Sequence, residues 1–90
     1  MAQQWPLTKR VEVEWMDSCA TGGWKSVETH LKNSGLLICR TLGYLVEETE
    51  VHLLIAQSQS HDTKNVSDTI AIPRAMVRRF RRIPSAWKDT

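Results

Sequence analysis

Two tryptophans near the start of the chain enclose a short segment of glycines and small oxygen-bearing residues. The residues concerned are Trp15, Asp17, Ser18, Gly22, Gly23 and Trp24. Indole rings stack on planar groups, glycine lets backbone approach a ligand, and short oxygen-bearing side chains hydrogen-bond its polar edge. We therefore expect a pocket for a nucleotide-like ligand. The alternative is that both tryptophans are core residues and that Asp17 caps the loop.

Other polar and basic residues are expected to complete this pocket. Gln57 and Ser58 follow a long apolar run and would add hydrogen-bonding groups at the rim of a small barrel. Arg74 and Arg78 would neutralise phosphate, because guanidinium groups bind phosphate oxygens through paired hydrogen bonds. The predicted ligand-binding residues are Trp15, Asp17, Ser18, Gly23, Trp24, Gln57, Ser58, Arg74 and Arg78.

The cysteines and histidines do not have the spacing of a metal site. Two cysteines, Cys19 and Cys39, and three histidines form no pair of the kind that holds structural zinc. The run Ser60-His61-Asp62 contains the residue types of a catalytic triad, but neighbours in one loop cannot adopt its geometry. We expect no metal, no cofactor and no catalysis, and we interpret both cysteines as free thiols in a reducing cytoplasm.

Charge is nearly balanced overall but uneven along the chain. The net charge is +2, with −2 in residues 1–60 and +4 in residues 61–90. The acidic part includes Glu47–Glu50, and the basic part includes the arginines of Arg78–Arg82. Two interpretations remain open: oppositely charged solvated faces, or a basic face that binds an anion.

The apolar runs Leu42–Val46 and Val51–Ala56 flank the acidic residues Glu47–Glu50. This arrangement predicts an antiparallel hairpin with a solvated tip. Neither run alternates strictly between apolar and polar residues, so both faces should be partly buried. We expect the hairpin to form the centre of the sheet.

The clearest strand signal precedes the tryptophan-rich loop. Val11, Val13 and Trp15 alternate with charged residues, as expected for a strand with one wet face. Residues 16–23 are rich in glycine and small polar side chains, which favour a loop of fixed shape.

A short helix is predicted over residues 24–32. Trp24, Val27 and Leu31 have helical spacing, Thr21 is a possible cap, and the segment 33–35 contains a stop signal. Two helical turns are marginally stable alone, so we expect this helix to pack against the rest of the domain.

The C-terminal third begins with a polar connection over residues 58–68 and a short strand over 69–72. The segment Pro73–Val77 then resembles the closing part of SH3-like barrels, in which a proline starts one tight helical turn before the last strand. An amphipathic helix over residues 73–83 is the alternative, because its apolar residues also fit a period of 3.6.

These elements predict one small domain, because 90 residues provide one modest core. The expected fold is mainly β: an SH3-like or Sm-like barrel of about five strands with one short helix. We assign residues 9–83 to the barrel, 1–8 to an N-terminal arm and 84–90 to a tail.

The chain also contains the motifs V-E-W-x-D-S, G-W, G-Y-L-V-E-E-T, A-Q-S and I-P-R, in this order. It resembles a group of small proteins encoded in bacteriophage genomes that share this pattern over residues 11–83. The resemblance implies a phage source and a compact domain, and no biochemical activity comes with it.

Small non-catalytic phage proteins commonly act by binding, and the resemblance implies three functions. The leading hypothesis is a self-associating protein that sequesters a nucleotide-like signal of host antiviral defence. The second is an interaction module that inhibits a host enzyme, and the third is an Sm-like binder of RNA or single-stranded DNA. We expect a homo-oligomer in the host cytoplasm without membrane contact, since no apolar segment has the length of a membrane span.

Overall fold

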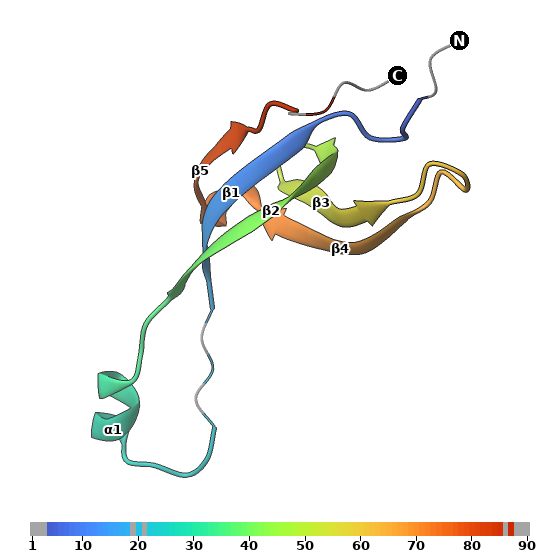
Figure 1. Cartoon of the computed structure of the whole chain (residues 1–90). Helices are drawn as coiled ribbons and strands as arrows, with labels where there is room; N and C mark the ends of the chain where they lie inside the picture. Colours follow the sequence, from blue (N-terminus) through green and yellow to red (C-terminus); the bar gives the residue numbers. More distant parts are fainter. Residues whose placement is uncertain (1–3, 19, 21, 86, 88–90) are drawn as a thin grey trace.

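The computed structural model describes residues 4–18, 20, 22–85 and 87, and its described strands form one antiparallel sheet (Figure 1). The elements are β1 (Arg10–Asp17), α1 (Val27–Lys32), β2 (Leu37–Glu48), β3 (His52–Gln59), β4 (Val66–Pro73), the 3-10 turn η1 (Arg74–Met76) and β5 (Val77–Arg82). The predicted mainly β fold with five strands and one short helix is confirmed. The strand order is β4-β3-β2-β1-β5. The sheet is open, with β4 and β5 at its edges.

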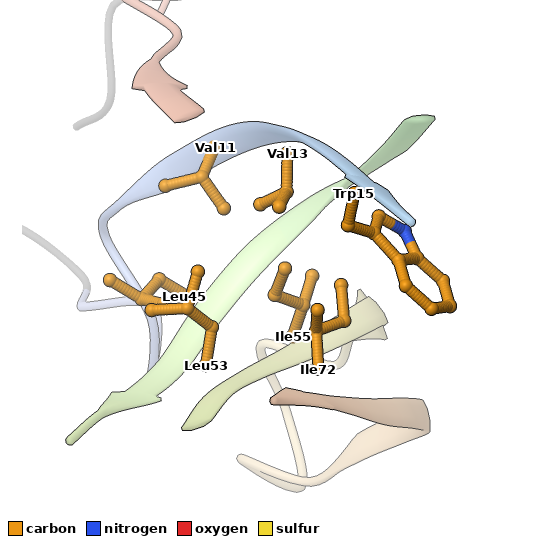
Figure 2. Close-up of a cluster of buried hydrophobic side chains, with 7 residues drawn as sticks. All are labelled: Val11, Val13, Trp15, Leu45, Leu53, Ile55 and Ile72. Atoms are coloured by element: carbon orange, nitrogen blue, oxygen red, sulfur yellow. The ribbon is translucent and has the colours of Figure 1, made fainter. Parts of the chain in front are cut away.

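The core lies on one face of the sheet. The alternation in β1, which the sequence predicted, buries Val11, Val13 and Trp15. Figure 2 shows these side chains facing residues from the three strands on the other side of the core. The opposing residues are Leu45, Leu53, Ile55 and Ile72. Each fully buried aliphatic side chain contributes about 1.5–3 kcal/mol, so the seven clustered residues hold the sheet in its curved form.

The predicted hairpin of β2 and β3 is present, and hydrogen bonds fix its tip. The Thr49 hydroxyl accepts the backbone N–H groups of Val51 and His52 at 3.1 and 3.0 Å. The His52 ring lies 2.8 Å from the carboxylate of Glu47. The acidic tip is therefore a structured turn as well as a solvated one.

The segment after Pro73 is a 3-10 turn followed by a strand, so the predicted tight turn and last strand are present and the alternative helix over residues 73–83 is not formed. β5 pairs antiparallel with β1, where Arg79 lies opposite Glu14 and Arg81 opposite Glu12. These cross-strand pairs stabilise the segment as a strand. The spacing of its apolar residues does not indicate them, because the partners are far apart in the sequence.

The strands β1 and β2 continue beyond the rest of the sheet as a two-stranded ribbon. Pairing with β3 begins at Tyr44 of β2, and pairing with β5 stops at Trp15 of β1. We call residues 16–38 the arm. Its outer end carries α1, which lies well away from the rest of the sheet (Figure 1). The molecule measures 64 × 25 × 24 Å, and its radius of gyration is 17.6 Å, whereas a compact domain of this length has about 12 Å.

The helix in the arm is shorter than predicted and does not pack on the sheet. It begins at Val27 because the hydroxyl of Ser26 caps it, accepting the N–H of Thr29 at 3.1 Å. No residue of α1 is buried, so the expectation that the helix packs against the rest of the domain is wrong. Thr21, the predicted cap, lies outside the described residues.

The close contact of β2 with β3 gives a test of the fold. A Cβ atom on Gly43 would lie 2.5 Å from the carbonyl oxygen of Ala56 and 2.7 Å from a methyl carbon of Ile55. Gly43→Ala should therefore lower the free energy of unfolding by about 1–3 kcal/mol, measured by chemical denaturation. Gly22→Ala is the control, because a Cβ there meets no atom within 4 Å. Equal stability of the two variants would contradict the strand contact.

Candidate functional site

The two tryptophans predicted to form one pocket lie in different environments. Trp15 is 8% exposed, packs in the core (Figure 2) and donates its indole N–H to the Thr41 hydroxyl at 3.0 Å. Trp24 is fully exposed, at 105%, and lies in the arm. A ring enclosed by core side chains has little surface left for stacking on a base, so Trp15 matches the core interpretation.

The predicted polar residues of the pocket are also dispersed. Asp17 ends β1 and accepts the N–H of Ser18 at 2.8 Å, which is the loop-capping role considered for it. Gly23 precedes Trp24 in the arm and has a φ of 88°, a backbone conformation that favours glycine. Gln57 and Ser58 are exposed near the end of β3, beside the connection to β4.

Both arginines assigned to phosphate already have acidic partners. The guanidinium of Arg74 lies 3.0 Å from the carboxylate of Glu48 and 5.8 Å from the centre of the Phe80 ring. Arg78 lies 3.6 Å from the carboxylate of Glu14. The nine predicted residues thus divide among the core, the arm, the end of β3, the turn η1 and the start of β5, and the described contacts do not unite them in one site.

Glu14 is the centre of a charged cluster on the face of the sheet opposite the core. Its side chain is 12% exposed and lies 2.6 Å from Arg79, 3.6 Å from Arg78 and 3.8 Å from Arg40. The hydrogen bond from Arg79 lowers the pKa of Glu14, and the charges of the three arginines add to this effect while desolvation opposes it. A similar bond joins Arg81 to Glu12 at 2.9 Å, so glutamates partly neutralise the basic run.

A shallow cavity is associated with this cluster. It is lined by Glu12, Glu14, Arg40, Arg79, Phe80 and Arg81. None of its lining residues belongs to the nine predicted for the ligand. Because carboxylates already occupy guanidinium donors there, the cluster is built primarily to hold β5 and β2 against β1.

The apolar surface of the arm is the feature that sequence reasoning missed. Six large apolar side chains in and beside α1 are at least half exposed. They are Trp24, Val27, Leu31, Leu36, Leu37 and Ile38, and we call them the apolar arm surface. A signal was present in Leu36–Ile38: three consecutive apolar residues cannot all be buried by a two-stranded ribbon.

The number of exposed apolar side chains makes the arm a candidate interaction site, because large exposed apolar patches on soluble proteins commonly bind a partner. The helix supports the same conclusion, because six residues are too few for a stable isolated helix. Val27 and Leu31 are one helical turn apart, so a single partner surface can cover both. The apolar arm surface is the strongest candidate site in the described part of the chain.

The shift in the Glu14 pKa predicts a change in the acid stability of the fold. A carboxyl group whose pKa is lowered on folding stabilises the protein at pH values above its pKa in the unfolded chain, which is near 4.5 here. This stabilisation disappears as the pH falls through the pKa of the folded state. Glu14→Gln should be less stable than the wild type at pH 7, and the difference should shrink below about pH 4. Thermal unfolding between pH 3 and pH 7 tests this, with Glu50→Gln at the exposed hairpin tip as the control. A difference that is independent of pH would contradict it.

The two tryptophans should respond oppositely to truncation. Trp15→Ala removes a buried ring and should cost about 3–5 kcal/mol of unfolding free energy. Trp24→Ala should leave the unfolding free energy unchanged within about 0.5 kcal/mol, because nothing in the described structure covers this ring. Denaturation curves of the two variants provide the measurement. Marked destabilisation by Trp24→Ala that does not depend on protein concentration would show that the arm folds back onto the sheet.

The described residues contain no group of three potential metal ligands. No helix in this part of the chain is long and apolar enough to cross a membrane. Comparisons of the chain with protein-family models, with curated proteins and with solved structures find no match.

Proposed function

We propose that this protein is a non-enzymatic interaction module that binds protein through the apolar arm surface. The observation that carries the proposal is the complete exposure of Trp24 next to Val27 and Leu31, on an arm that extends away from the sheet. The sheet acts as a rigid base, because its core and its cross-strand ion pairs are complete without the arm.

The composition of this surface favours a protein partner. An exposed tryptophan on the same arm as exposed leucine, isoleucine and valine has the composition of a protein interface centre, from which charged residues are depleted. Tryptophan is also the residue type that most often dominates the binding energy. A nucleotide would need convergent hydrogen-bonding groups and cations around the ring, and Arg74 and Arg78 are paired elsewhere.

Nucleotide sequestration therefore has less support than the interaction module. The two rings expected to stack on the base lie in different places: Trp15 is buried in the core, and Trp24 is exposed in the arm. Binding of RNA or single-stranded DNA has less support for a different reason. Glu12 and Glu14 lie among the arginines that would contact phosphate, and they would repel it.

The resemblance to phage-encoded proteins determines where the partner is sought. A phage protein of this kind would act in the cytoplasm of a bacterial host, against a host enzyme or a defence component. The binding experiment is therefore performed in bacterial cells that express the protein.

Site-specific photo-crosslinking tests the role of the arm. A photoreactive amino acid replaces Trp24, and the matched control carries it at Asp62, whose side chain is 98% exposed in the connection between β3 and β4. Position 24 should give a discrete adduct with a protein after irradiation, and position 62 should not. Mass spectrometry of the adduct identifies the partner, and Leu31→Asp in the same background should reduce its yield at least tenfold.

Two outcomes would overturn the proposal. One is the absence of any adduct from position 24, and the other is an equal pattern of adducts from positions 24 and 62. A small molecule retained by the purified protein and lost in Trp24→Ala would instead support the nucleotide hypothesis.

A further inference from the structure

We propose that the partner of the apolar arm surface is the same surface of a second copy, so that two arms pack in a symmetric antiparallel dimer. This inference rests on the proposed function and names the partner of that site. Three properties of the arm support it: its exposed area, its balanced charge and its distance from the sheet.

The exposed area is appropriate for a dimer of standard size. Leu37 and Ile38 are consecutive in β2 and point to opposite faces of the ribbon, so one contact face holds Trp24 and at most four of the aliphatic residues. A tryptophan contributes about 200 Å² and each aliphatic residue roughly 60–100 Å², which together give on the order of 500 Å² of apolar surface per copy. A stable interface buries about 800 Å² per partner, part of it polar. The apolar arm surface and its polar margin can supply this area from each copy without any contribution from the sheets.

The charge of the arm is suited to contact with itself. In residues 16–38 the two acidic side chains, Asp17 and Glu28, are balanced by Lys25 and Lys32. In a symmetric dimer the same surface faces itself, so a surface with an excess of one charge would repel its own copy. A surface with equal numbers of acidic and basic groups avoids this repulsion. A partner with a strongly charged face would gain nothing from this arm.

The positions of two charges on α1 define the orientation. Glu28 and Lys32 are one turn apart, on the same side of the helix and beside the stripe of Val27 and Leu31. In an antiparallel pair of helices, Glu28 of each copy lies near Lys32 of the other. Within one chain these two groups are 3.8 Å apart, and both are more than three-quarters exposed, so they are free to turn toward a second copy.

The shape of the molecule permits this contact. The arm projects along the long dimension of 64 Å, and α1 lies at its far end (Figure 1). Two copies can therefore join through their arms while their sheets remain apart. The short helix also gains the packing that six residues need, because Val27 and Leu31 become buried against their counterparts.

Reciprocal charge reversal provides the test. Sedimentation equilibrium of the full chain is compared for the wild type, Glu28→Lys, Lys32→Glu and an equimolar mixture of the two variants. Each variant alone should self-associate roughly tenfold more weakly than the wild type, because like charges meet twice across the axis. The mixture should recover wild-type affinity, because one copy then carries two lysines and the other two glutamates. A merely structural role of the helix would not produce recovery on mixing.

A second comparison locates the interface. Trp24→Ala should weaken the dimer on the order of a hundredfold, since the ring is lost from both copies. Asp62→Lys, on the connection between β3 and β4, should leave the affinity unchanged. Circular dichroism and thermal unfolding confirm that each variant retains the sheet.

Three results would overturn this inference: a wild type that is monomeric at high concentration, a dimer unaffected by Trp24→Ala, or charge variants that do not recover on mixing. A monomer whose position 24 crosslinks to a different protein would remove the dimer and leave the proposed function intact. Failure of crosslinking at position 24 would remove both.

Discussion

The fold depends on the strict alternation of side chains in β1. This strand lies between β2 and β5, and each of its faces has a separate task. Val11, Val13 and Trp15 on one face form the core with residues of β2, β3 and β4. Glu12 and Glu14 on the other face bind arginines of the two neighbouring strands. A shift of one residue in β1 would bury the glutamates and expose the core, so the register is fixed by both faces at once.

The arm is a consequence of how β1 and β2 extend beyond their neighbours. Among the residues that the structure describes, no third strand lies beside the ribbon past Trp15 and no helix lies across it, so its apolar residues do not reach the core. A two-stranded ribbon is marginal in water without further packing. The stable sheet and the uncovered arm thus divide the chain into a part that folds on its own contacts and a part whose apolar residues are left for a partner.

The candidate site shows why residue types near one another in sequence can be misleading. Trp15 and Trp24 are nine positions apart, and the same loop composition that suits a ligand pocket also suits a change from a strand to a projecting arm. The alternation of β1 directs Trp15 inward, whereas Trp24 lies beyond the last strand contact. Arg74 and Arg78 differ from the expectation for a related reason: their partners, Glu48 and Glu14, are distant in sequence.

The sequence by itself determined the strand at Val11–Trp15 and the hairpin around Glu47–Glu50, because these depend on alternation and on local turn chemistry. Only the tertiary structure decided that residues 77–82 form a strand, since the helical period of their apolar residues competes with pairing to β1. It alone also decided that α1 remains uncovered. Local periodicity identifies an apolar face, but what covers that face depends on contacts between segments far apart in the chain.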